Sequence, residues 1–311
     1  MNKPTLKQVV SHSIKVVLTL VILYFVGAQL AQNWESVVQY EWKLDFLLLF
    51  VSLILHLVTF ILLSWVWCQL MLGFGYQVPL RHGFKVAYIA NLGRYIPGRI
   101  WPVFGMMYVA KQIKVPKETA VASWGIALLF GTPASFVVAL AGMWLYPEIL
   151  SGSWGIYLKG QLPILTAATA LISICLLFLP KIVVSWMNLL LKRLKRPVMQ
   201  FEMSVRMASV VYFGYMACWI VYGFAFWVFL RSLSPDHRIT PAAAICAFVT
   251  AYQAGYFMIF TPGGIGAREL VMSAILAPFI GPAAVGIAIA ARVWNTLSDI
   301  VASIIAIKIK L

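Results

Sequence analysis

The sequence predicts an all-α polytopic membrane protein with about six full transmembrane helices and two re-entrant broken-helix hairpins, arranged as inverted repeats. Three observations predict this class. The chain of 311 residues is 62% hydrophobic and 11% charged, and apolar runs of about 20 residues, enough to cross a bilayer, recur along it. Two apolar stretches are interrupted by a Pro-Gly pair in the same way. The basic residues gather in loops that would face one side of a membrane.

Six apolar runs are long enough to cross the hydrocarbon core as unbroken helices. The first follows Lys3, Lys7 and Lys15, as in a signal peptide, but no small-residue cleavage site comes after it. We therefore expect an uncleaved first span. The six expected spans lie at about residues 14–32, 44–72, 118–146, 161–180, 207–230 and 283–307.

Two further apolar stretches, at about 80–112 and 240–280, are broken near their middle. The first break reads YIPGRI (95–100) and the second FTPGGIGARE (260–269). Because proline lacks an N–H and glycine weakens a helix, neither stretch can cross a bilayer as one unbroken helix. Backbone freed from its hydrogen bonds at membrane depth is tolerated only inside protein or beside a water-filled cavity. We expect each stretch to be a re-entrant hairpin of two half-helices.

The distribution of the basic residues tests this topology. The formal charge of +15 is spread over short loops, not gathered in a basic domain, which argues against nucleic-acid binding. With the N-terminus inside, Arg268 and Arg292 lie within the membrane, and all but four other basic residues lie on the cytoplasmic side. The four on the outer side are Lys43, Lys159, Arg231 and Arg238.

The cluster Lys111, Lys114 and Lys117 favours re-entrance of 80–112, since a full crossing would move these residues outside. Units of about 44–146 and 207–307 would then cross in opposite directions within a single transmembrane domain over 1–311. Such inverted repeats are typical of transporters with alternating access. We expect a multi-pass protein of the bacterial cytoplasmic membrane with both termini in the cytoplasm.

The segment of about 181–197 alternates apolar residues with a basic end. It predicts either an amphipathic helix on the cytoplasmic surface, which would attract anionic lipids, or a plain basic loop that obeys the topology rule.

Ionisable residues inside a membrane are costly and usually functional. Arg292, Asn295 and Asp299 lie on one face of the last span, because their spacings of 3 and 4 are about one helical turn. We expect Arg292 to pair with Glu269, or Asp299 to pair with Arg268. The pairs would either hold the hairpin in place as a structural network or form a seat for an anionic headgroup.

The breaks supply further candidates. Backbone N–H groups at the start of a half-helix favour a phosphate or carboxylate, which points to Pro262, Gly263, Gly264 and Gly266, and Arg268 would add a bidentate clamp. Asn91, Arg94 and Arg99 of the first hairpin would reach the same group from the cytoplasmic side. His56 and Gln69 are lone polar residues, for which we expect satisfied helix–helix contacts rather than a proton relay.

No pattern indicates a metal, a cofactor or an enzyme. Each of the four cysteines stands alone in an apolar run, with no histidine at ligand spacing, so we expect neither a disulfide framework nor a zinc site. The sequence contains no nucleophile elbow and no P-loop, which favours a transporter.

The runs NLGRYIPGR (91–99) and TPGGIGARE (261–269), with the basic-flanked multi-span layout, resemble one family. It is the lysylphosphatidylglycerol synthase transmembrane-region family, a flippase-like domain, and the resemblance covers about residues 10–307. The resemblance implies a lipid translocase. Because the chain lacks the soluble aminoacyl-transferase domain of the synthases, we expect a stand-alone member that is not itself a synthase.

The predicted function is a lipid flippase that moves an anionic, phosphate-bearing lipid or lipid-linked precursor between leaflets. Movement would be downhill or coupled to an ion, with Glu269 and Asp299 as candidate proton carriers. Expected partners are that lipid, the surrounding membrane lipids, and either lipid-synthesis enzymes or a second copy of the chain. The alternatives are a membrane-embedded lipid- or glycan-modifying transferase and a non-transporting scaffold of a lipid-synthesis complex.

Overall fold

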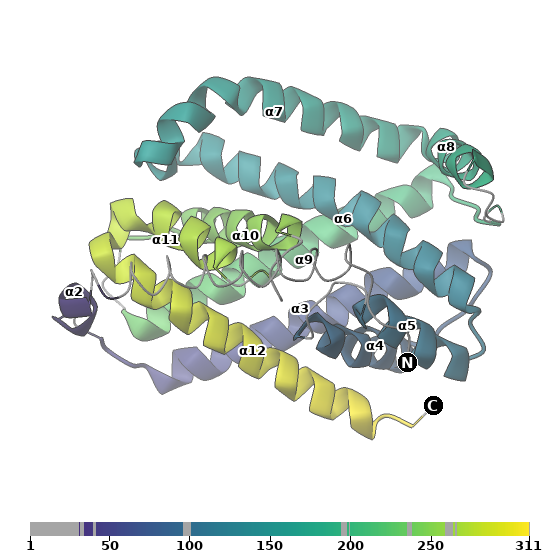
Figure 1. Ribbon diagram of the computed structural model, residues 1–311, viewed down its shortest axis with the longest axis horizontal. Coiled ribbons are helices and arrows are strands. Elements are labelled where there is room, and N and C mark those ends of the chain that lie inside the picture. The colour runs from purple at the N-terminus through teal and green to yellow at the C-terminus, as the bar shows by residue number, and fades with distance from the viewer. Residues whose placement is uncertain are drawn as a thin grey trace, which may run out of the picture.

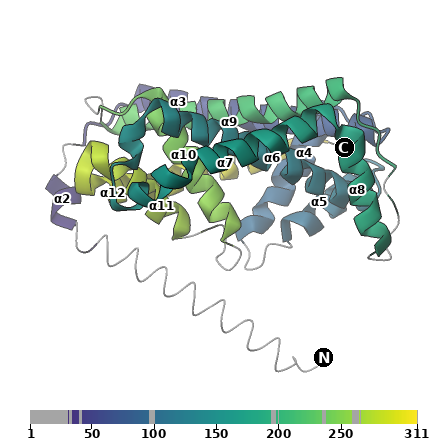
Figure 2. The ribbon, with the colours of Figure 1, turned by 90° about the horizontal axis from the view of Figure 1, so that it is seen from above.

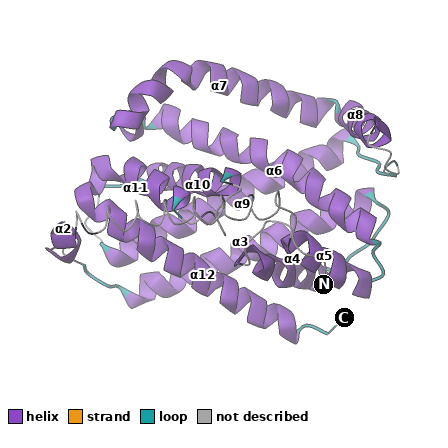
Figure 3. Cartoon of the chain, in the orientation of Figure 1, coloured by secondary structure: helices purple, strands orange, loops and turns teal. Residues whose placement is uncertain are grey.

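The computed structural model describes residues 31, 34–39, 42–95, 101–193, 198, 200–234, 238–258, 264 and 266–310. Every regular element within these residues is a helix (Figure 1, Figure 3), and five helical stretches are long and apolar enough to cross a membrane. The prediction of an all-α polytopic membrane protein is therefore confirmed. The first expected span, 14–32, lies outside the described residues except for residue 31, and the short helix α2 (Trp34–Gln39) follows it.

The other five expected spans are present within a few residues of their predicted bounds, except that the third of them begins about two turns early. Each has 25 to 29 residues. They are α3 (Phe46–Gly73), α6 (Lys117–Leu145), α7 (Ser153–Phe178), α9 (Val205–Leu233) and α12 (Ala284–Lys308).

Local sequence signals explain where these helices begin. The Asp45 carboxylate accepts the N–H groups of Leu47 and Leu48, at 2.9 and 3.0 Å, and so caps the first turn of α3. Ser204 caps α9 in the same way, and Pro116 immediately precedes α6, where a proline costs the helix nothing.

The two broken stretches each form a pair of short helices. The first pair is α4 (Leu80–Asn91) and α5 (Trp101–Gln112), with a 3-10 turn (Leu92–Tyr95) after α4. The second is α10 (Pro241–Phe257) and α11 (Ala267–Ile280). The members of each pair pack against each other, and all four fall short of the ~20 residues of a full crossing.

The two pairs start from opposite ends of the molecule, because α3 and α9 are antiparallel. At one end, the N–H of Asp45 donates to the carbonyl of Ser232 at 2.8 Å. At the other, the N–H of Glu202 donates to the carbonyl of Gly73 at 3.0 Å. Since α4 follows the end of α3 and α10 follows the end of α9, the short pairs point toward each other (Figure 1, Figure 2). Re-entrance into a bilayer stays a prediction, and this is the geometry that it requires.

The helix contacts follow a regular pattern. The eight helices can be matched in four couples: α3 with α9, α4 with α10, α5 with α11, and α6 with α12. Whenever two of these helices are in contact, their two counterparts are in contact as well. The α3–α9 contact maps onto itself, and the α4–α12 contact becomes the α10–α6 contact. Two inverted units would produce this pattern, so it favours the predicted repeats.

Helix α3 shows which surface meets lipid. Its exposed side chains include Leu47, Phe50, Ile54 and Ile61, which share one face. Its opposite face buries polar residues completely, namely Ser52, His56, Thr59 and Ser64. Apolar residues outside and polar residues inside are the arrangement expected of a protein whose surroundings are hydrocarbon.

The basic segment of about 181–197 begins as a helix, α8 (Pro180–Arg193), which rules out a plain loop over these residues. It lies across the ends of the long helices and not along them (Figure 1, Figure 2). Ile182, Trp186 and Leu189 are exposed at about one-turn spacing, and Lys192 and Arg193 end the helix. This is the layout of a helix that lies in a membrane surface.

Candidate functional site

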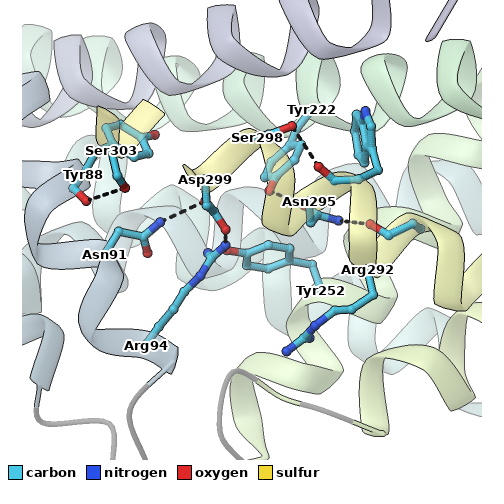
Figure 4. A network of polar contacts seen from close by, with 12 residues as sticks. Tyr88, Asn91, Arg94, Tyr222, Tyr252, Arg292, Asn295, Ser298, Asp299 and Ser303 are labelled. Carbon is cyan, nitrogen blue, oxygen red and sulfur yellow. Dashed lines mark hydrogen bonds and ion pairs between the residues drawn. The ribbon is translucent and has the colours of Figure 1, made fainter. Parts of the chain in front are cut away.

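Nine of the predicted site residues are described, and the charged ones gather where the two short pairs meet α12. The close-up in Figure 4 shows the part of this cluster that lies between α4 and α12. Arg99, Pro262 and Gly263 lie outside the described residues. The nine are Asn91, Arg94, Gly264, Gly266, Arg268, Glu269, Arg292, Asn295 and Asp299.

Asp299 on α12 forms an ion pair with Arg94, which sits in the 3-10 turn after α4. Asn91 at the end of α4 donates to the other carboxylate oxygen of Asp299 at 3.1 Å, and Asp299 is 1% exposed. The prediction that Asp299 pairs with Arg268 is therefore wrong. α4 packs directly against α12, so its inner end delivers Arg94 to this carboxylate.

Arg292, two turns earlier on α12, pairs with Glu269 on α11 as predicted, with 3.5 Å between Nη1 and Oε1. The other carboxylate oxygen of Glu269 accepts the N–H of Gly266 at 2.6 Å. Gly266 has a φ of 90°, a left-handed conformation that favours glycine. Glu269 thus caps its own helix, and this N–H is not free for a ligand as the sequence suggested.

Arg268 takes a different position from the other two arginines. Its guanidinium carbon lies 4.0 Å from the centre of the Tyr252 ring on α10, a cation–π contact. It is 9% exposed, and its Nε has no hydrogen-bond partner among the described residues. Within the described part of the chain it forms no ion pair with a carboxylate.

Glycines bring the backbone close to Arg268. A Cβ on Gly255 would lie 3.3 Å from Nε of Arg268, and a Cβ on Gly264 would lie 2.5 Å from the carbonyl oxygen of Gly255. Gly264 also has a positive φ of 70°. The end of α10 and the turn before α11 can therefore approach this closely only with glycine at position 264, and a side chain at position 255 would have to displace Arg268 slightly.

Tyr252 connects the two breaks, and nothing in the sequence marked it. Its hydroxyl accepts a hydrogen bond from Nη1 of Arg94 at 3.4 Å, while its ring lies under Arg268. One arginine comes from each broken stretch. An aromatic residue in an apolar helix gives no signal of such a role, because most such residues are simply packed.

Tyr222 also belongs to the site, and no sequence signal indicated it. The Tyr222 hydroxyl on α9 donates to Oδ1 of Asn295 at 2.7 Å, and Nδ2 of Asn295 donates to the carbonyl of Ala291 at 2.9 Å. Gln253 on α10 is 6% exposed, and its Oε1 has no partner among the described residues.

The prediction for His56, a satisfied helix–helix contact, is wrong. His56 is completely buried, and neither ring nitrogen has a hydrogen-bond partner among the residues that the structure describes. Its surroundings are the rings of Phe60, Tyr222 and Trp294.

Among the described residues, the cluster combines three guanidinium groups with two carboxylates, so these side chains together carry an excess positive charge. Buried charge is costly unless it is paired, and a guanidinium fork matches the oxygens of a phosphate or carboxylate. The arrangement can therefore hold one more anion, next to Arg268.

A family model described as the lysylphosphatidylglycerol synthase TM region matches residues 13–303 of the chain. No curated protein matches it.

Proposed function

The chain belongs to the lysylphosphatidylglycerol synthase transmembrane-region family, and on that premise we propose that it is a lipid flippase. It would move an anionic, phosphate-bearing lipid or lipid-linked precursor between the leaflets of the bacterial cytoplasmic membrane. The chain is a multi-pass membrane protein, and the family supports a lipid-related role. The flippase activity, the cytoplasmic membrane and the cytoplasmic termini are part of the proposal.

The observation that carries the proposal is that the buried Arg268 faces no carboxylate among the described residues. Arg94 and Arg292 each face a carboxylate, whereas Arg268 faces an aromatic ring. A cation at membrane depth without a counter-charge favours binding of an anion from outside the protein. A lipid phosphate fits, since its tail can remain in the bilayer while the headgroup enters between the short helix pairs.

The helix arrangement supports movement between leaflets. The short pairs point toward each other from opposite ends, and each contributes one arginine to Tyr252. Units of about 44–146 and 207–307 that rock against each other would open this point first to one side and then to the other. The ion pairs that α12 makes with α11 and with the turn after α4 would break and re-form as the short helices move.

Reconstitution in liposomes tests the proposal. We expect the protein to move fluorescent phosphatidylglycerol between leaflets, and to move zwitterionic phosphatidylcholine much more slowly. Arg268→Gln should lower the rate of phosphatidylglycerol movement by about tenfold or more, because one charge-assisted hydrogen bond to the headgroup would be lost.

Arg231→Gln is the matched control, since Arg231 also lies over an aromatic ring, 5.9 Å from the centre of Trp227, but away from the cluster. It should move lipid at the unchanged rate. Equal rates for Arg268→Gln and the unsubstituted protein would refute the anion site. Chemical conversion of the lipid would favour a transferase, and neither movement nor conversion would favour a scaffold.

A further inference from the structure

His56 lies on the buried face of α3, enclosed by three aromatic rings. The ring centres lie 4.5 Å from Phe60 on the same helix, 4.4 Å from Tyr222 on α9, and 4.4 Å from Trp294 on α12. The histidine therefore sits where the central helix pair meets α12, the helix that carries both ion pairs.

The polar neighbours of His56 on α3 are all satisfied within their own helix. Ser52, Thr59 and Ser64 each donate a hydroxyl hydrogen bond to a carbonyl three or four residues earlier, at 2.7 to 3.1 Å. An imidazole cannot make that local bond, and both nitrogens of His56 lack partners among the described residues. Each buried, unpaired polar atom costs about 1–3 kcal/mol. A phenylalanine or leucine would fill this space without that cost.

The three aromatic rings offer an attraction for a charged imidazole, which acts against the cost of burying that charge. Aromatic faces attract cations, and three rings surround this imidazole. Histidine is also the side chain that gains or loses a proton near neutral pH. The two carboxylates that the sequence offered as proton carriers, Glu269 and Asp299, each form an ion pair with an arginine. A proton on either of them would remove an ion pair.

We propose that His56 is the proton-binding site of this transporter, and that uptake of one proton on its imidazole is coupled to lipid movement. This inference rests on the proposed flippase function and names its driving ion. The proton would come from water on the side to which the site is open and would leave to water on the other side. No other group changes its bonding state in that step.

The contacts of His56 explain how its charge would act on the helices. Tyr222, in contact with the imidazole, holds Asn295 on α12. Trp294, also in contact with it, donates to Ser52 on α3 at 3.2 Å. A positive charge at His56 would repel Arg94, which ties α4 to α12. Proton uptake would therefore weaken the attachment of α4 to α12.

Several other titratable or charged groups lie on the helices packed around α3 and would feel the same charge. They are Tyr88 and Arg94 on or just after α4, Cys218 and Tyr222 on α9, and Arg292 and Asp299 on α12. Tyr252 on α10 lies within ring contact of Tyr222.

The test uses proteoliposomes with fluorescent phosphatidylglycerol, with and without a pH difference of about two units across the membrane. In the unsubstituted protein the gradient should change the rate of lipid movement by about fivefold or more, since protonation of the site on one side shifts the equilibrium between its two open states. His56→Gln, which stays polar but cannot take up a proton, should move lipid at one rate under both conditions.

His82→Gln is the matched control, because His82 on α4 also has an unpartnered Nε2 but lies away from the rings. It should keep the gradient dependence. His56→Phe guards against misfolding of His56→Gln: it should melt at the same or a higher temperature than the unsubstituted protein and also lose the dependence. Full gradient dependence in both His56 variants, or none in the unsubstituted protein, would overturn the assignment while lipid movement itself persists. A protein that moves no lipid at all would overturn the flippase function and this assignment together.

Discussion

Two contacts of the molecule occupy equivalent places in the pattern of helices but are built differently. The α4–α12 contact is held by polar groups: Asp299 bound by Arg94 and Asn91, the Ser303 hydroxyl donating to the Tyr88 carbonyl at 3.2 Å, and Lys85 Nζ donating to the Ile309 carbonyl at 2.5 Å.

The α6–α10 contact is built from small residues. A Cβ on Gly142 would lie 2.5 Å from Cβ of Cys246, and the Cys246 thiol donates to the Ala139 carbonyl at 3.2 Å. No charged side chain takes part among these residues.

The difference suggests which contact opens. Polar groups that separate can be satisfied again by water or by a lipid headgroup, whereas close helix packing loses its dispersion contacts as soon as a gap forms. We therefore expect α6–α10 to stay fixed and α4–α12 to open during transport. The following substitutions test this view, from the largest expected effect to the smallest.

Asp299→Leu should have the largest effect, because it leaves the guanidinium of Arg94 without its buried partner. Removing one member of a buried pair typically costs about 3–5 kcal/mol. The free energy of unfolding, measured by denaturant titration in detergent, should fall by about that amount. The double variant Arg94→Leu/Asp299→Leu should recover much of the loss. A double variant as unstable as the single one would show that the ion pair is not what holds α4 to α12.

Gly142→Ala should have the next largest effect, since even one methyl group meets Cys246 at 2.5 Å. Overpacking of this kind costs about 1–3 kcal/mol. The melting temperature should drop, and lipid movement should slow only as far as folded protein is lost. Gly125→Ala, in the same helix, is the control, because a Cβ there meets nothing within 4 Å. If both alanines behave alike, α6–α10 is not the close-packed contact described.

Substitutions of Glu269 separate its two contacts. Glu269→Gln keeps an oxygen for the N–H of Gly266 but loses the charge that faces Arg292, whereas Glu269→Ala loses both. The free energy of unfolding, obtained from thermal unfolding, should be lower for Glu269→Ala than for Glu269→Gln by about 1 kcal/mol, the usual contribution of a helix cap. Equal stability of the two variants would mean that the cap contributes nothing.

Ser303→Ala should have the smallest effect. Hydrogen bonds between helices in membranes contribute about 0.6 kcal/mol on average. The control is Ser298→Ala, since Ser298 donates to Trp294 of its own helix. If the polar contact opens during transport, Ser303→Ala should speed lipid movement slightly while Ser298→Ala leaves it unchanged. A slower rate for Ser303→Ala would argue that α4–α12 must stay closed.

The fold was largely readable from the sequence, because hydrophobic length and Pro-Gly breaks are local signals. Five spans and both pairs of short helices lie where the apolar runs and Pro97 and Pro262 predict them. The Arg292–Glu269 pair was also predictable, since α11 leads directly into α12.

The Asp299–Arg94 pair was missed, although the predicted topology held the information. In that topology the first hairpin would enter from the cytoplasmic end, where Asp299 would lie on α12, and the second would enter from the outer end, nearer to Arg292. Tyr252, Tyr222 and the orphaned state of His56 could not be found in this way. Each depends on side-chain packing between helices that are distant in sequence. In the sequence, an aromatic residue or a single histidine in an apolar run looks alike whether it belongs to a site or only fills space between helices.

The bond from Lys85 to Ile309 has a practical consequence. It ties the residue that follows the final helix to the second turn of α4, so the backbone near Ile309 must shift whenever that short helix moves. A fluorophore attached near Ile309 should therefore report movement of α4. A bulky protein fused at the same place should hinder that movement.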